Sequence, residues 1–265
     1  MKGIILSGGT ATRLFPLTAT TSKQLLPIYD RQMIFYPLNT LIEAGIKDIL
    51  IIVSPEHSGQ YLNLLGSIFS QNKIRLQFKV QKIPRGLADA FIMGENFIGK
   101  ENVTMILGDN IFEKNFSSEI KKFRSGGLIF AKKVRDPERF GVVKFDENHK
   151  AVEIVEKPKK WISDFAIPGL YVYDNRVIRV AKEVIPSERG ELEITEIHNF
   201  FLERGELQVS EFSQEWLDAG TFETLLEAGK IVKEKKLYEK FNPLINEAIL
   251  KFNQELKILA KKRLI

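Results

Sequence analysis

The residues most able to do chemistry lie in one short turn near the N-terminus. Gly8 and Gly9 directly follow an apolar run, Arg13 comes four residues later, and Lys23 ten residues after that. Glycines let backbone N–H groups approach an anion closely, because no Cβ stands in the way. A guanidinium binds two phosphate oxygens at once, whereas an ammonium acts as a compact point charge. The turn therefore predicts a phosphate site, and the alternative is an ordinary turn with two solvated cations.

Two nucleotide-binding motifs are missing from this turn. A dinucleotide fingerprint needs Gly-x-Gly-x-x-Gly, but Thr10 and Arg13 stand at its second and third glycine positions. A Walker A loop ends in Gly-Lys-Ser or Gly-Lys-Thr, and no such tripeptide follows. The sequence thus argues against a nucleotide-dependent oxidoreductase and against P-loop ATPases and GTPases.

Two carboxylates and a further lysine stand beside other predicted strands. Asp109 follows the apolar run 103–107, Asp218 precedes a glycine turn, and Lys157 ends the strand-like run 152–155. Mg²⁺ binds one or two carboxylates together with phosphate oxygens, so a carboxylate near a phosphate turn predicts a metal. The alternatives are turn or helix capping for the carboxylates and a solvated loop residue for the lysine.

Composition sets the outer bounds. The chain has 265 residues, of which 44% are hydrophobic, enough for the core of one soluble enzyme domain. It has no Cys, which excludes disulfides, thiolate metal sites and cysteine nucleophiles. No run is long enough to span a bilayer and no cleavage pattern follows the N-terminus, so we expect a cytoplasmic protein.

The positive charge is concentrated in the C-terminal segment. The net charge is +5, yet residues 230–265 alone carry ten basic and four acidic side chains. The rest of the chain is therefore close to neutral. This distribution argues against a nucleic-acid-binding body.

Strand-like and helix-like runs alternate along the first half. This order predicts an α/β fold with a mostly parallel sheet covered by helices. From 128 to 155 several short strands predict an additional antiparallel or mixed layer at the sheet edge. The expected strands cover 2–6, 48–53, 74–80 and 103–107, and the expected helices cover 33–43, 61–69, 86–97, 175–184, 194–203 and 221–235.

Taken together, eight short motifs make the chain resemble the sugar-phosphate nucleotidyltransferases. The resemblance implies a Rossmann-like, mostly parallel mixed sheet flanked by helices, with a small extra β layer, the nucleotide-diphospho-sugar transferase fold. It implies a catalytic domain over 1–235, with a nucleotide half to about 110 and a sugar-phosphate half beyond it. The motifs are Gly-Gly-x-x-Thr-Arg-Leu-x-Pro at 8–16, Ser-Lys-Gln-Leu-Leu-Pro at 22–27, Gly-Leu-Ala at 86–88, Leu-Gly-Asp-Asn at 107–110, Arg-Phe-Gly-Val-Val at 139–143, Glu-Lys-Pro at 156–158, Arg-Gly-Glu-Leu-Glu-Ile-Thr at 189–195 and Trp-Leu-Asp-x-Gly-Thr at 216–221.

The resemblance also implies a reaction. A sugar 1-phosphate attacks the α-phosphate of a nucleoside triphosphate and releases pyrophosphate, with Mg²⁺ as the cofactor. The similarity is strongest to members that use dTTP and glucose 1-phosphate in nucleotide-sugar biosynthesis. UTP or another sugar 1-phosphate is an alternative, and a non-catalytic regulatory protein that binds nucleotide sugars is an alternative of another class.

Each matching residue takes a role from the resemblance. The implied catalytic residues are Arg13, Lys23 and Lys157, and the implied metal ligands are Asp109 and Asp218. The implied nucleotide contacts are Gly8, Gly9, Thr12, Arg13, Gln24, Gln81, Gly86 and Asp109. The implied sugar-phosphate contacts are Leu87, Leu107, Asn110, Gly141, Glu156, Lys157, Gly169, Tyr171 and Arg189.

The chain departs from the family pattern at several points. Ala11 replaces a common glycine of the phosphate loop, Phe140 a tyrosine and Pro168 a threonine. Residues 236–265 form a shorter, basic tail, predicted to be an amphipathic helix that packs on the body or on another subunit, or that meets RNA or a membrane. We expect a homo-oligomer, dimer or tetramer, without nucleic-acid or membrane partners.

Overall fold

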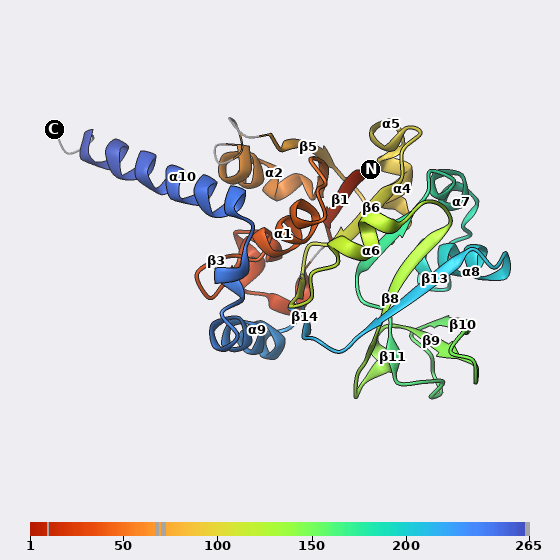
Figure 1. Cartoon of the computed structure of the whole chain (residues 1–265). Helices are drawn as coiled ribbons and strands as arrows, with labels where there is room; N and C mark the ends of the chain where they lie inside the picture. The colour runs from red at the N-terminus through yellow and green to blue at the C-terminus, as the bar shows by residue number, and fades with distance from the viewer. Residues whose placement is uncertain (10, 67–68, 70–72, 263–265) are drawn as a thin grey trace.

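A ten-stranded mixed sheet forms the centre of the computed structural model, which describes residues 1–9, 11–66, 69 and 73–262 (Figure 1). Its strands are β1 (Lys2–Ser7), β4 (Asp48–Val53), β5 (Arg75–Val80), β6 (Val103–Leu107), β8 (Gly127–Lys133), β9 (Gly141–Phe145), β10 (Ala151–Glu156), β11 (Phe165–Ala166), β12 (Leu170–Tyr173) and β13 (Leu207–Phe212). The spatial order is β10-β9-β11-β8-β12-β6-β1-β4-β5, and β13 lies beside β8.

The parallel part of the sheet sets the place of a site. Strands β5, β4, β1 and β6 lie side by side in that order and run parallel. From β1 the chain passes to β4 and then β5 on one side, and it then crosses to β6 on the other side of β1. In open α/β sheets, ligands bind at the carboxyl ends of the strands where the winding reverses. Here that reversal lies between β1 and β6, the two strands followed by the glycine turn and by Asp109.

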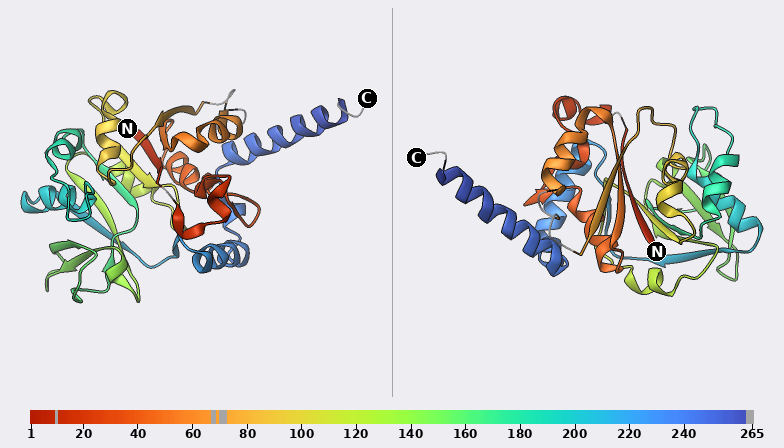
Figure 2. Two further views of the ribbon diagram at one scale, coloured as in Figure 1. Left: turned by 180° about the vertical axis from the view of Figure 1, so that it is seen from behind. Right: turned by 90° about the horizontal axis from the view of Figure 1, so that it is seen from above.

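Helices cover both faces of the sheet (Figure 2). Alternate residues of the central strands serve opposite faces: Ile49 and Ile51 join one buried cluster, and Leu50 and Ile52 join the other. Near-continuous apolar runs thus place these strands at the centre, as predicted. The helices are α1 (Phe35–Glu43), α2 (Ser58–Tyr61), α4 (Asp89–Met93), α5 (Glu95–Ile98), α6 (Ser117–Lys122), α7 (Val177–Glu183), α8 (Ile194–Glu203), α9 (Phe222–Glu234) and α10 (Pro243–Lys262).

The predicted fold class is confirmed, with local differences. The helix expected over 86–97 is two short helices that meet at Gly94, where an added Cβ would lie 2.9 Å from the Ile4 side chain. The helix expected over 61–69 is a π-helical turn, Leu62–Gly66, after α2, and its residues 67 and 68 lie outside the described part of the chain. The short strands of 128–155 extend the sheet edge in antiparallel order.

The sequence did not predict two small β-ladders. One pairs β2 (Pro27–Ile28) with β3 (Arg31–Gln32). The other pairs β7 (Asn110–Phe112) with β14 (Trp216–Asp218), which are a hundred residues apart. Strands of two or three residues carry too little periodicity to be recognised from sequence.

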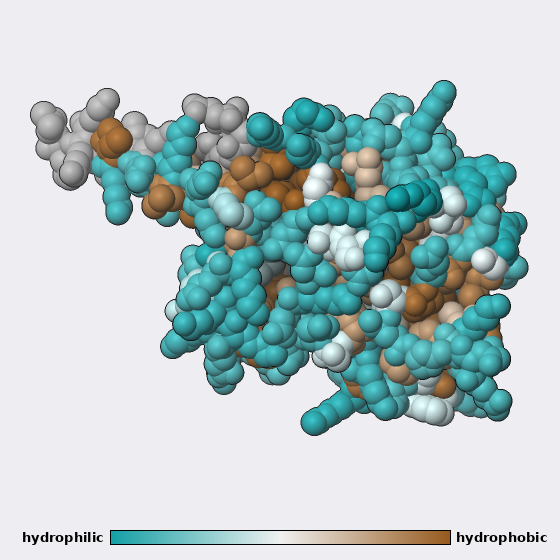
Figure 3. All heavy atoms as spheres, in the orientation of Figure 1, coloured by the Kyte–Doolittle hydropathy of each residue, from teal (hydrophilic) through white to brown (hydrophobic). Residues whose placement is uncertain are grey.

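The C-terminal segment first packs on the body and then leaves it. Phe241 is buried, with the Arg31 guanidinium 4.2 Å from its ring and the Tyr36 ring edge-on at 5.1 Å. Ile245 and Ala248 are also buried against the body, as the tail's apolar spacing predicted. Beyond them α10 projects outward (Figure 1), and the surface view shows apolar residues at its base and along it (Figure 3).

Part of the tail's predicted apolar face lies outside the described side chains. The apolar residues that recur at helical spacing there are Ile245, Ala248, Ile249, Phe252, Leu256 and Leu259, and the side chains of Leu256 and Leu259 are not among those described. Within the described residues, no helix is long and apolar enough to cross a membrane.

Phe241 should anchor the tail. Because its ring is buried, Phe241→Ala should lower the free energy of unfolding by about 3 kcal/mol, through lost burial and a residual cavity. Leu250→Ala, in α10 where the side chain is 59% exposed, should change it by less than about 0.5 kcal/mol. Urea unfolding followed by circular dichroism compares the two variants, and equal effects would contradict the docked arrangement.

Candidate active site

The glycine turn follows β1 at the point where the sheet's winding reverses. Gly9 adopts a positive φ of 101°, and an added Cβ on Gly8 would lie 2.8 Å from Gln81 Oε1. Ala11 occupies the left-handed region with φ 47° and ψ 30°, a conformation that costs a residue with a Cβ about 1 kcal/mol. Its carbonyl accepts a hydrogen bond from Thr18 Oγ1 at 3.0 Å. The turn therefore keeps a left-handed residue at this position even though it is not glycine.

The β7–β14 ladder brings the two predicted metal ligands together. Asp218 pairs in register with Asn110, and the Ala219 N–H donates to the Asp109 carbonyl at 3.1 Å. The carboxyl-bearing residues thus come from distant parts of the sequence to one edge of the sheet. Both side chains are largely buried, at 15% exposure for Asp109 and 19% for Asp218.

Cations surround this carboxylate pair. Lys23 Nζ forms an ion pair with Asp109 Oδ2, and Arg139 Nη2 lies 3.9 Å from Asp218 Oδ2. The Arg13 guanidinium lies next to Gly220, where an added Cβ would be 3.1 Å from Nη2. Two anionic and three cationic groups are therefore gathered in one small volume.

The two carboxylates differ in their acidity. Burial and the nearby Asp109 charge together raise the pKa of Asp218 to about 6, against the opposing effect of Lys23, Arg13 and Arg139. Burial also acts to raise the pKa of Asp109, but the adjacent Lys23 ammonium and the Asn110 amide outweigh it and hold that pKa below its ordinary value. Environments that separate the pKa values of neighbouring carboxyls are typical of functional sites.

A cavity of about 490 Å³ opens beside the pair. It is lined by Arg13, Asp109 and Asp218 and by all nine residues predicted to contact a sugar phosphate. Those nine come from strands, loops and helix ends spread over a hundred residues. They are Leu87, Leu107, Asn110, Gly141, Glu156, Lys157, Gly169, Tyr171 and Arg189.

Asn110 links the cavity wall to the carboxylates. Its Oδ1 accepts from Trp216 Nε1 at 2.7 Å and from the Gly169 N–H at 2.9 Å, and its Nδ2 donates to Asp109 Oδ1 at 3.0 Å. This network fixes the orientation of the amide, because a carbonyl oxygen accepts and an amide nitrogen donates. Asn110 therefore positions Asp109 and Trp216 relative to each other.

The far side of the cavity holds Lys157 and an acidic cluster. Lys157 follows the last residue of β10 and its side chain is 47% exposed, so its ammonium is available to an anion. Arg189 is held by carboxylates instead: its Nη2 bonds both oxygens of Glu193 at 2.9 Å and lies 3.5 Å from Glu156 and from Glu191. Burial raises the pKa of Glu156, opposed by Lys157 and Arg189.

A second hollow of about 370 Å³ is lined by two of the predicted nucleotide residues, Gly9 and Gln81, together with Pro84. Gly8, Thr12, Gln24 and Gly86 are not among the residues that line it. Gln24, next to Lys23, is buried, and its Oε1 accepts from Ser22 Oγ at 2.7 Å and from the Tyr61 hydroxyl at 3.2 Å. It lines neither of the two hollows. Thr12 begins an exposed 3₁₀ turn that carries Arg13.

Sequence reasoning missed several residues that line the larger cavity. Arg139 and Trp216 stand within motifs that the sequence analysis quoted, so those motifs were a usable signal. Thr195 ends the quoted motif at 189–195, so that motif also carried a signal, whereas nothing in the local pattern points to His198 on α8. The others are Phe140, Ile167, Glu191, Glu193 and Ile194.

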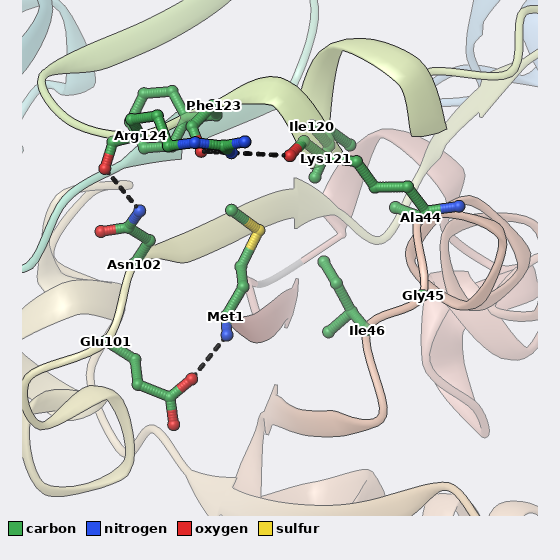
Figure 4. Close-up of a pocket in the computed structure, with 10 residues that line it drawn as sticks. All are labelled: Met1, Ala44, Gly45, Ile46, Glu101, Asn102, Ile120, Lys121, Phe123 and Arg124. Carbon is green, nitrogen blue, oxygen red and sulfur yellow. Dashed lines mark hydrogen bonds and ion pairs between the residues drawn. The ribbon is translucent and has the colours of Figure 1, made fainter.

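Another hollow, of about 520 Å³, lies at the amino-terminal edge of the sheet, away from these groups (Figure 4). Met1, Asn102 and the 44–46 turn line it, and all three precede parallel strands. The Met1 ammonium bonds Glu101 Oε2 at 2.5 Å. None of the predicted site residues line this hollow, which agrees with ligand binding at the opposite, carboxyl edge.

Comparison with known proteins decides the family. Residues 2–235 match the model of the nucleotidyl transferase family. The chain belongs to this family. The match confirms the family inferred from the motifs.

This nucleotidyl transferase is similar to several named proteins. The glucose-1-phosphate thymidylyltransferase of Neisseria gonorrhoeae is 52% identical over 239 residues, 88% of this chain and 83% of that protein. That of Mycolicibacterium smegmatis is 47% identical over 242 residues, 89% and 84% of the two chains.

Solved structures agree. A Bacillus anthracis structure described as a glucose-1-phosphate thymidylyltransferase in complex with sucrose has a TM-score of 0.82 at 42% identity, covering 87% of this chain and 94% of that one. A UDP-glucose pyrophosphorylase with UDP-glucose has a TM-score of 0.77 at 23% identity and supports the fold alone.

Asp218 gives a pH-dependent prediction. Its pKa of about 6 in the native protein exceeds the ordinary value of 3.8, so ionisation costs stability, and the protein loses that stability as pH rises from about 4 through 6. Asp218→Asn stays neutral. In metal-free buffer it should therefore raise the free energy of unfolding at pH 7.5 by about 2 kcal/mol more than at pH 4.5.

Urea unfolding at both pH values measures this difference. The exposed Glu147→Gln variant is the control for a generic loss of negative charge. A gain for Asp218→Asn that is equal at the two pH values, or larger at pH 4.5, would show that burial does not raise the pKa of this carboxyl.

Proposed function

We propose that this enzyme transfers a thymidylyl group from dTTP to α-D-glucose 1-phosphate, forming dTDP-glucose and pyrophosphate. The observation that carries the proposal is the 490 Å³ cavity, which joins Arg13 and the carboxylate pair to the nine predicted sugar-phosphate residues. Relatives with this activity in their names are 52% and 47% identical over most of the chain. We also propose a cytoplasmic location and a homo-oligomeric state.

The chemistry fits the groups available. A sugar phosphate oxygen is already ionised at neutral pH, so no general base is needed to activate it. His198 lines the cavity, but burial lowers its pKa to about 3, so it is a neutral side chain rather than an acid catalyst. What the reaction needs is charge neutralisation between two anionic substrates and in-line alignment.

Three cations divide that work in our proposal. Arg13, beside Gly220 at the mouth of the carboxylate site, would hold the triphosphate and stabilise the departing pyrophosphate. Lys23, kept in place by its ion pair with Asp109, would neutralise the α-phosphate. Lys157, half-exposed at the other side of the cavity, would hold the phosphate of the incoming sugar in line.

The carboxylate pair fits Mg²⁺. No group of three or more His, Asp or Glu side chains in the described part of the chain is placed to hold a metal, so a cage made only of protein ligands is not indicated. Mg²⁺ usually takes one or two carboxylates and completes its shell with phosphate oxygens and water. Asp109 and Asp218 would hold it, and it would supply positive charge to the reacting phosphates.

The two substrates would occupy different hollows. Glu156 and the backbone around Gly141 and Gly169 would bind the sugar hydroxyls in the larger cavity. Gln81 and Gly86 would face the pyrimidine edge beside the smaller one. UTP shares that edge with dTTP, so it is the closest competing nucleotide.

Removing single charges tests the assignment. Asp109→Asn and Lys157→Ala should each lower kcat/KM by about 10²–10³, because each removes one preorganised electrostatic contact. Lys159→Ala, an exposed neighbour, should stay within a few-fold of the parent enzyme. Pyrophosphate release measured with dTTP and glucose 1-phosphate gives these values, and near-parental activity of either site variant would remove that residue from the mechanism.

A substrate panel tests the function itself. Nucleoside triphosphates should be crossed with sugar 1-phosphates, with Mg²⁺ and with EDTA. We expect the highest kcat/KM for dTTP with glucose 1-phosphate and no turnover in EDTA. Absence of turnover with every pair would overturn the enzymatic proposal, and turnover that EDTA does not affect would overturn the metal's role.

A further inference from the structure

Gln81 is held in one orientation by a buried carboxylate that the reaction does not use. Gln81 Nε2 donates to Asp89 Oδ2 at 2.8 Å, and both side chains are buried, with Asp89 1% and Gln81 6% exposed. A carboxylate only accepts hydrogen bonds. The Gln81 atom that faces Asp89 must therefore be the amide nitrogen, and the amide oxygen must point the other way.

The opposite side of the amide agrees with this assignment. Gln81 Oε1 lies against the glycine turn, 2.8 Å from where a Cβ on Gly8 would stand. Gly8 therefore leaves room for an acceptor at the edge of the hollow that Gln81 lines. A flip of the amide would set its oxygen against the Asp89 carboxylate, which places two acceptors together in a buried site, an arrangement that proteins avoid.

Asp89 is itself held in place. Arg85 Nη2 donates to Asp89 Oδ1 at 2.5 Å, so the carboxylate's two oxygens have different partners. The loop between them is tied to the segment before α8, since the Leu192 N–H donates to the Arg85 carbonyl at 2.7 Å and the Ala88 N–H to the Leu192 carbonyl at 3.1 Å. Asp89 is the first residue of α4. It is not one of the described residues that line either substrate hollow.

We propose that Asp89 is a positioning residue that selects the nucleobase by fixing which atoms Gln81 presents. This inference rests on the proposed function, in which Gln81 faces the base. The fixed amide presents Oε1 as an acceptor and the second Nε2 hydrogen as a donor. Thymine and uracil match this pair with N3–H and a neighbouring carbonyl. Cytosine places an unprotonated N3 opposite Oε1, so two acceptors face each other and cytosine is rejected.

The test compares dUTP with dCTP, because these triphosphates share their sugar and differ at the base edge. With glucose 1-phosphate and Mg²⁺, the parent enzyme should use dUTP with a kcat/KM at least about 10-fold above that for dCTP, the effect of one mispaired buried hydrogen bond. Asp89→Asn keeps the shape, but because Arg85 can only donate and holds the one remaining oxygen, the new amide turns an N–H toward Gln81 and favours the flipped orientation of Gln81. It should therefore narrow the dUTP-to-dCTP ratio by about 10-fold while leaving the dUTP-to-dTTP ratio unchanged.

Arg85→Lys is the matched control, because it changes the partner of Asp89 but keeps a cation beside the carboxylate. Its dUTP-to-dCTP ratio of kcat/KM should equal that of the parent enzyme.

A merely structural role for Asp89 would lower activity with every triphosphate equally. The dUTP-to-dCTP ratio would then stay unchanged in Asp89→Asn, which would overturn the inference. If Asp89→Asn is unfolded by thermal melting, Asp89→Gln carries the same test. A parent enzyme that uses dCTP as well as dUTP would also overturn it, whereas no turnover with dTTP would overturn the proposed function instead.

Discussion

The rest of the site depends on holding two carboxylates beside each other in a largely buried place. Asp109 and Asp218 come together only because the short β7–β14 ladder pairs segments a hundred residues apart. Burial disfavours the charged form of Asp218, and repulsion by the Asp109 charge adds to this effect, so the pKa of Asp218 lies near 6. The pair is stable in this arrangement because Lys23, Arg13 and Arg139 surround it. A site with this charge layout is prepared for a further cation and for anionic substrates.

The larger architecture explains why these groups meet. The parallel strands end at one edge of the sheet, and the reversal between β1 and β6 leaves a space there that no crossover helix fills. The antiparallel strands beyond β6 then form the wall that carries Lys157 and Glu156. In our proposal, one half of the sheet supplies the triphosphate side and the other half the sugar-phosphate side. The proposed activity comes from position and charge rather than from a protein nucleophile.

The sequence predicted much of this because its signals were local. Apolar runs such as 103–107 identify buried strands, and motifs such as 107–110 mark the loops after them. What it could not predict depends on contacts between distant residues. Three side-chain hydrogen bonds join residues that come close only in the folded chain. They link Trp216 to Asn110, Arg189 to Glu193 and Gln81 to Asp89. The close approach of Ile4 on β1 to Gly94, where the predicted 86–97 helix is divided, is likewise a contact between distant parts of the sequence.

We propose that Asp109 and Asp218 jointly hold a divalent cation, which would supply positive charge to the reacting phosphates. Anomalous diffraction from crystals grown with Mn²⁺, glucose 1-phosphate and a non-hydrolysable dTTP analogue tests this role directly. We predict an anomalous peak between the two carboxylates, about 2.1 Å from an oxygen of each and bonded to phosphate oxygens. A peak bound by phosphate oxygens alone, with both carboxylates outside the coordination shell, would contradict the account.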